Sequence, residues 1–147
     1  MEKFSDSLGN QLNIAARWMR ITLEKELAGT GITPSMWMII MALGEKNNQG
    51  QTELGKMVNL DNATITRLLD KLQEMSLLVR NQDKEDRRAQ KVSLTRKGQK
   101  MYHELNAIGK RVNDQASKNL SLKDIKKLLE WLEVINLNLN SNHAVRL

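Results

Sequence analysis

The sequence contains no cysteine, which excludes disulfide bonds, thiolate metal sites and cysteine nucleophiles. Its only histidines, His103 and His143, lie far apart in the chain, so neither a metal site nor a cofactor is predicted. No run of about eighteen apolar residues is present, which argues against a membrane span. The N-terminal segment also lacks the basic and apolar stretches of a signal peptide. We therefore expect a cytoplasmic protein with no membrane partner.

The chain is also poor in residues that build active sites. One tyrosine, two histidines and no cysteine leave few nucleophile–base pairs, and no glycine-rich phosphate loop occurs. We expect no catalytic residues and no enzyme activity. One proline and eight glycines in 147 residues favour a mostly helical chain.

The positive charge is concentrated in one part of the sequence. The net charge is +6, and residues 80–100 alone carry eight basic and three acidic side chains, a local charge of +5. A focused basic patch of this kind is typical of a protein that binds a polyanion such as nucleic acid. A solvated charged loop is the alternative interpretation.

The first half of the chain predicts a helix-turn-helix. Apolar residues spaced by three and four predict an amphipathic helix from Leu8 to about residue 28. Thr33 and Pro34 then begin a second helix that is apolar on most sides and should be central. Residues 47–50 are predicted to form a turn. Short helices over 52–58 and 62–75 follow, the latter capped by Asp61.

A charged loop between two short strands comes next. The apolar run at 77–80 and the alternating segment 89–94 predict a β-hairpin, and a hairpin directly after a helix-turn-helix is the winged variant of that motif. Thr95 caps a long helix to about residue 119, and Ser121 with Asp124 caps a last helix over 122–139. The predicted fold class is therefore mostly α with a small β hairpin (α+β).

The terminal helices carry apolar stripes that need a partner surface. We predict a winged helix-turn-helix DNA-binding region at 31–95, flanked by a helical dimerisation region at 1–30 and 96–147. A two-fold homodimer through these helices would bury the stripes. The alternative is that they pack on the winged core of the same chain.

Residues 61–98 resemble the recognition helix and wing of the MarR/SlyA family of bacterial transcription regulators. The matching motifs are Thr66-Arg67-Leu68 with Leu72, Asp86-Arg87-Arg88, Leu94-Thr95-x-x-Gly98 and, upstream, Ile32-Thr33-x-x-x-Trp37. Two positions depart from the family pattern. Ser76 stands where a glycine is usual, and Lys84 where a proline is frequent. We expect the first departure to shift the end of the recognition helix slightly, and the second to loosen the tip of the wing and add a charge there.

A helix in the major groove reads base edges with its N-terminal residues. On the helix that Asp61 opens, asparagine can pair with adenine, arginine with guanine, and a threonine methyl can contact thymine. For Asn62, the alternative to base reading is ordinary capping and solvent exposure. For Arg67, the alternatives to base reading are a phosphate contact and an ion pair with Asp70. The predicted recognition residues are Asn62, Thr64, Thr66 and Arg67.

The resemblance implies that an arginine at the hairpin tip enters the minor groove, oriented by an aspartate. Arg88 and Asp86 match these two positions, with Arg87 beside them, and narrow A·T-rich grooves attract arginine. A simple hairpin ion pair between Asp86 and Arg88 is the alternative. Further phosphate contacts are predicted at Thr52, Lys91 and Lys97.

The family commonly binds small aromatic anions between the winged domain and the dimer helices. An effector site of this kind would include Arg17, Trp18, Met36 and Trp37, although tryptophan and methionine at helical spacing are also typical of a core. The predicted function is a homodimeric, sequence-specific regulator of a pseudo-palindromic double-stranded DNA operator, a repressor released by an aromatic or phenolic effector. The alternatives are a winged-helix protein-interaction module and a nonspecific architectural DNA-binding protein.

Overall fold

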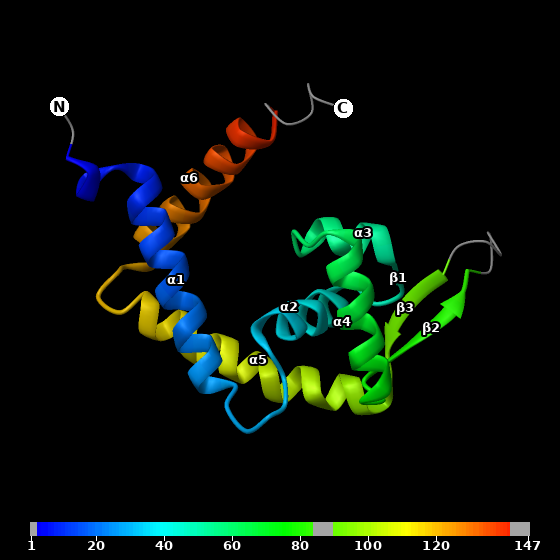
Figure 1. The fold of residues 1–147 in the computed structure, drawn as a ribbon. Coiled ribbons are helices and arrows are strands. Elements are labelled where there is room, and N and C mark those ends of the chain that lie inside the picture. The colour runs from blue at the N-terminus through cyan, green and yellow to red at the C-terminus, as the bar shows by residue number, and fades with distance from the viewer. Residues whose placement is uncertain (1–2, 84–89, 142–147) are drawn as a thin grey trace. The chain divides into compact units, whose positions relative to one another are not determined.

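The computed structural model describes residues 3–83 and 90–141. They form two compact units, of which the first ends at Val112 and the second begins at Asn113, within the last turn of α5. The elements, shown in Figure 1, are η1 (Phe4–Asp6), α1 (Leu8–Glu26), α2 (Pro34–Glu45), β1 (Gln49–Gly50), α3 (Gln51–Met57), α4 (Asn62–Glu74), β2 (Leu78–Gln82), β3 (Gln90–Leu94), α5 (Arg96–Ala116) and α6 (Leu122–Ser141).

Helix α2 supplies the centre of the core in the first unit, as its sequence predicts. The Thr33 hydroxyl accepts a hydrogen bond from the Met36 amide at 3.3 Å, and Pro34 occupies the first helical turn. A helix that is apolar on most sides is stable only when it is surrounded, and other elements of the first unit enclose it. Its fully buried side chains are Met36, Ile39, Ile40 and Leu43.

The three strands form an antiparallel sheet in the order β1-β3-β2. Leu78 pairs with Leu94 and Gln82 with Gln90 across the hairpin, which confirms the predicted wing strands. The predicted turn at 47–50 is wrong in its second half, because Gln49 and Gly50 pair with β3 as a third strand. A strand of two residues is too short to produce an alternating pattern, so the sequence carries no signal for it.

The end of α4 requires a left-handed residue, and Ser76 takes that conformation with φ 59°. The Ser76 amide donates to the Gln73 carbonyl at 2.8 Å and the Leu77 amide to the Leu72 carbonyl at 2.9 Å, the pair of bonds that defines a Schellman cap. Serine therefore adopts the conformation that favours glycine, at some backbone strain, and α4 still ends at Glu74.

Helices α2 and α5 contact each other at two places, where each presents a glycine to an aromatic ring of the other. A Cβ at Gly44 would lie 2.1 Å from the Tyr102 ring, and a Cβ at Gly109 would lie 2.6 Å from Trp37 Cζ2. Larger residues at these two positions would push the helices apart. The sizes of these two residues therefore set the spacing between α2 and α5.

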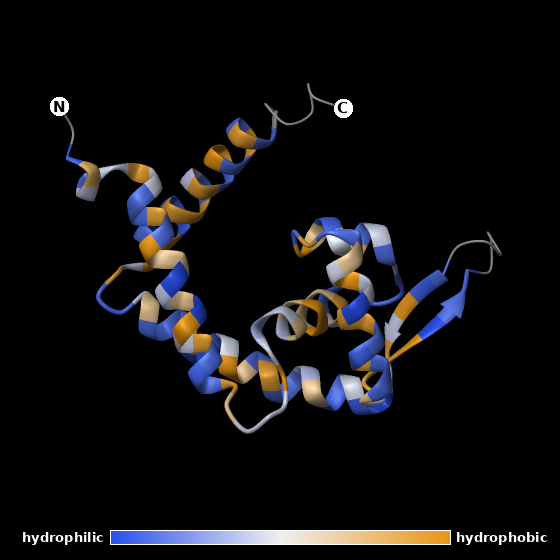
Figure 2. Ribbon diagram, in the orientation of Figure 1, coloured by the Kyte–Doolittle hydropathy of each residue, from blue (hydrophilic) through white to orange (hydrophobic). Residues whose placement is uncertain are grey.

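The second unit consists of the last residues of α5 and helix α6. Ser121 and Asp124 bond reciprocally: the Ser121 amide donates to the Asp124 carboxylate at 3.0 Å, and the Asp124 amide donates to the Ser121 hydroxyl at 3.2 Å. This confirms the predicted capping box. The Ser121 hydroxyl also donates to the Asp124 carboxylate at 2.6 Å, and this bond, followed by the one from the Ser121 amide, lowers the pKa of Asp124. Among its described side chains, α6 has none that is buried, and apolar colour recurs along its length in Figure 2.

Candidate nucleic-acid interface

The first turn of α4 is held by Asp61. Its carboxylate accepts from the Thr64 amide at 2.8 Å and from the Thr64 hydroxyl at 2.7 Å. These bonds, the backbone one first, lower the pKa of Asp61, so the cap is charged at neutral pH. A negative charge here also complements the helix dipole. The start of the proposed recognition helix is therefore firmly defined.

The hydroxyl protons of the two threonines on this helix are committed within the protein. Thr64 donates to Asp61, and Thr66 donates to the Asn62 carbonyl at 2.7 Å while accepting from the Gln51 amide side chain at 2.7 Å. Within the described ranges, no hydrogen bond or ion pair is found for the side chains of Asn62 and Arg67, and both residues are exposed. These two therefore have the free polar groups with which α4 can read base edges.

Sequence analysis missed the role of Arg80 on β2. Its guanidinium contacts Asp70 Oδ1 at 2.7 Å and Gln73 Oε1 at 2.8 Å, and its side chain is 17% exposed. Asp70 therefore pairs with Arg80 and not with Arg67. A signal was present, because strand alternation places Arg80 on the same face as buried Leu78, where a charged side chain needs a partner.

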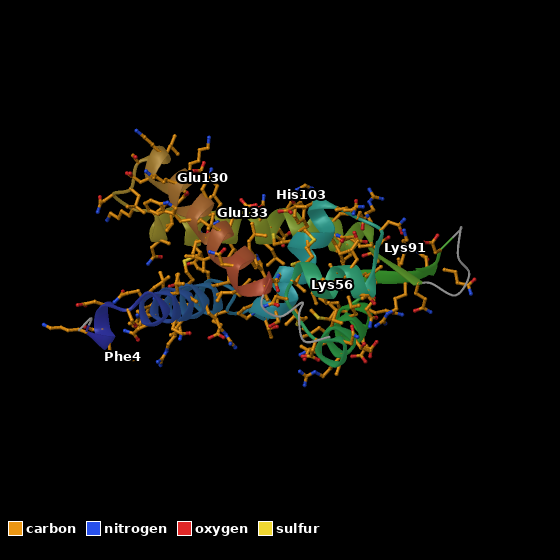
Figure 3. All side chains as sticks on the ribbon, turned by 90° about the horizontal axis from the view of Figure 1, so that it is seen from above. Phe4, Lys56, Lys91, His103, Glu130 and Glu133 are labelled. Carbon is orange, nitrogen blue, oxygen red and sulfur yellow. The ribbon has the colours of Figure 1, made fainter. Side chains whose placement is uncertain are left out.

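The wing tip, with the predicted residues Asp86, Arg87 and Arg88, lies outside the described residues. At the loop end of the two hairpin strands, Lys91 Nζ lies 3.2 Å from Asp83 Oδ2 (Lys91 is labelled in Figure 3). Lys91 therefore has a carboxylate partner at the predicted phosphate-contact position.

The start of α5 is attached to the end of α4. Lys97 Nζ donates to the Met75 carbonyl at 2.8 Å, the Thr95 hydroxyl to the Ser76 carbonyl at 2.7 Å, and the Thr95 amide to the Leu77 carbonyl at 3.0 Å. Thr95 and Lys97 thus bond three successive carbonyls at this turn. The ammonium of Lys97, a predicted phosphate contact, is thus hydrogen-bonded to the C-terminal end of α4. Thr52, the remaining predicted phosphate contact, is exposed in the first turn of α3.

The four predicted effector residues have different environments. Arg17 and Trp18 are exposed on α1, whereas Met36 is fully buried. Trp37 is half-buried, and its indole Nε1 donates to the Leu105 carbonyl on α5 at 3.2 Å. A pocket at the turn between α1 and α2 is lined by other residues, among them Arg20, Glu24, Thr33 and Ser35.

The described part of the chain offers neither a metal-binding cluster nor a membrane span. No group of three or more histidine, aspartate or glutamate side chains there could hold a metal ion. Within residues 3–83 and 90–141, no helix combines the length and apolar character needed to cross a membrane.

Comparison with known proteins gives one family match. Residues 32–89 match the model of the MarR family. The fold is similar to that of a probable transcriptional regulator from Pseudomonas aeruginosa, with 28% identity, a TM-score of 0.82, and coverage of 90% of this chain and 99% of that one. MarR from E. coli is 22% identical with a TM-score of 0.74, and the match covers 88% of this chain and 96% of that one. BpsR of Bordetella bronchiseptica is 19% identical with a TM-score of 0.80, and the match covers 88% of this chain and 98% of that one. The DNA binding of BpsR is regulated by 6-hydroxynicotinic acid.

Proposed function

We propose that this chain is a MarR-family protein and a homodimeric, sequence-specific transcription regulator of double-stranded DNA in the cytoplasm; the family match of residues 32–89 and the winged-helix fold support this assignment. The observation that carries the proposal is the exposed face of α4, where Asn62 and Arg67 have uncommitted polar groups. In each subunit α4 enters the major groove, and the wing, with Asp86, Arg87 and Arg88, enters the adjacent minor groove.

The dimer is proposed from the apolar side chains that the terminal helices expose. On α1, Leu8 and Trp18 are 60% and 61% exposed, and on α6, Leu129 and Leu139 are each 61% exposed. Monomeric proteins seldom leave so many large apolar side chains in water. A two-fold dimer that buries them would place two α4 helices about one DNA turn apart, which requires a pseudo-palindromic operator with half-sites roughly 10 bp apart.

The wing is tested by selecting bound sites from random duplex DNA at near-physiological salt. We expect wild type to enrich an inverted repeat, and Arg88→Ala to lose that enrichment while its circular-dichroism melt is unchanged, because the minor-groove contact is removed without touching the core. An Arg88→Ala protein that binds the selected site as tightly as wild type would refute the wing role. Salt-sensitive binding to all duplexes would favour an architectural protein, and no binding at low salt an interaction module.

The protein is further proposed to be a repressor that a small aromatic or phenolic anion releases from DNA. Support comes from the cation of Arg17 beside Trp18 on α1 and from the half-buried indole of Trp37. BpsR of Bordetella bronchiseptica, a structural neighbour, is regulated by an aromatic acid.

Salicylate at millimolar concentration is expected to quench tryptophan fluorescence and to weaken DNA binding by at least threefold, with benzyl alcohol as the uncharged control. A titration that changes neither signal would eliminate this ligand class.

A further inference from the structure

One arginine of the hairpin joins the two elements proposed to contact DNA. Arg80 extends from β2 to α4, where its guanidinium meets Asp70 Oδ1 at 2.7 Å, Gln73 Oε1 at 2.8 Å and the Thr66 carbonyl at 3.5 Å. These acceptors are spaced by four and three residues, so a single guanidinium spans two turns of one helix face.

The burial of Arg80 and the balance of its charge argue against a contact between its guanidinium and a DNA phosphate. Its side chain is 17% exposed, and its charge is balanced by Asp70. An arginine that has three acceptors and little access to solvent is poorly placed to neutralise a DNA phosphate. Its planar fork instead holds α4 in one rotation about its axis, which the point charge of a lysine cannot do.

The part of α4 that Arg80 contacts begins at Thr66, a predicted recognition residue, and Arg67 is another. Arg80 reaches the carbonyl of Thr66, while Gln51 of α3 binds the hydroxyl of the same residue, and Arg67 follows directly. Rotation of α4 would move the Arg67 guanidinium relative to the wing. A base contact tolerates little displacement, whereas a phosphate contact tolerates more.

We propose that Arg80, acting through Asp70 and Gln73, is a positioning residue for sequence discrimination: it sets the orientation of α4 relative to the wing without touching DNA. This inference rests on the proposed DNA-binding function. It predicts that losing the contact lowers specific affinity while nonspecific affinity, which is carried by phosphates, stays nearly constant.

The test measures binding of the full chain to its selected site and to an unrelated duplex over a range of salt. We expect Arg80→Lys and Asp70→Asn each to weaken specific binding about tenfold, with nonspecific binding within twofold of wild type. The double variant should bind the selected site as tightly as either single variant, since both substitutions remove the same contact. Arg111→Lys is the matched control, because Arg111 pairs with Glu26 at 3.0 Å away from α4, and it should bind as wild type does.

The salt dependence separates positioning from direct contact. For positioning, the slope of log affinity against log salt stays at the wild-type value, whereas loss of a phosphate contact reduces it by about one. A reduced slope with equal losses on both duplexes would overturn the proposal, as would unchanged discrimination in both variants. Asp70 is 55% exposed, so Asp70→Asn keeps the test valid if Arg80→Lys misfolds.

Amide hydrogen exchange without DNA tests the contact separately from the function. We expect Arg80→Lys and Asp70→Asn to increase exchange at residues 66–74 of α4 and to leave α2 unchanged. If wild type binds no duplex, the proposed function fails, and the exchange result still decides whether Arg80 holds α4. Unchanged exchange in α4 would overturn the positioning role.

Discussion

Replacing Gly98 by alanine is expected to lower the free energy of unfolding by about 3 kcal/mol, the upper end of the usual cost of overpacking. Gly98 is buried in the first turn of α5, and a Cβ there would lie 1.9 Å from the Leu77 carbonyl oxygen. The backbone of α5 fixes the position of this Cβ, the Leu77 oxygen is itself a backbone atom, and the same carbonyl accepts the Thr95 amide. No side-chain rotation can relieve the clash, so α5 must move away from the turn between α4 and β2.

Urea unfolding followed by circular dichroism measures this change. Gly9→Ala is the control, because Gly9 is exposed in the first turn of α1 and a Cβ there would meet nothing within 4 Å. The control should be neutral or more stable by up to about 1 kcal/mol, since alanine favours the helix. If both variants unfold at the wild-type urea concentration, the close approach of α5 to Leu77 is wrong.

The second large effect is expected on α6, where Leu129→Glu combined with Leu139→Glu should convert the proposed dimer to monomers. Both side chains are 61% exposed in the single chain, so the substitutions cost little there. Central interface residues contribute about 2 kcal/mol each, and two-fold symmetry counts every substitution twice. We therefore expect the dimer dissociation constant to rise by at least ~1000-fold, and affinity for an inverted repeat to fall by at least ~100-fold.

Sedimentation velocity and DNA-binding anisotropy measure the two losses. The control is Lys123→Gln with Lys127→Gln, which changes the net charge by the same amount on the opposite side of the helix, given 100° per residue. That protein should remain dimeric. A dimer that survives both glutamates would show that α6 does not form the interface.

Much of the fold was predictable because its signals are local. Thr33, Asp61 and Thr95 cap the helices that follow them, and in each case a side-chain oxygen accepts an amide three residues on. The alternation of Val92 and Leu94 with polar neighbours marked β3 correctly. The long helix after Thr95 ends at Ala116 rather than near residue 119, as expected for helix ends, which are weakly specified.

The candidate site was predictable only in its outline. The order of the motifs indicated the family, and the early residues of α4 indicated the face that we propose reads DNA. The commitment of the Thr64 and Thr66 hydroxyl protons could not be foreseen, because it depends on how Asp61 and Gln51 are oriented once α3 and α4 have packed. Of the four predicted recognition residues, Asn62 and Arg67 are thus the two whose side chains have no hydrogen bond or ion pair within the described part of the chain.

The sequence by itself determined the helices, the hairpin and the concentration of positive charge, since periodicity, capping and composition act over a few residues. Only the tertiary structure decided the contacts between distant segments. It paired Arg80 with Asp70, brought Gly98 against Leu77, and gave the indole of Trp37 a carbonyl on α5. Such contacts depend on the rotation and separation of packed elements, to within an ångström or so, and no local pattern of residues encodes that geometry.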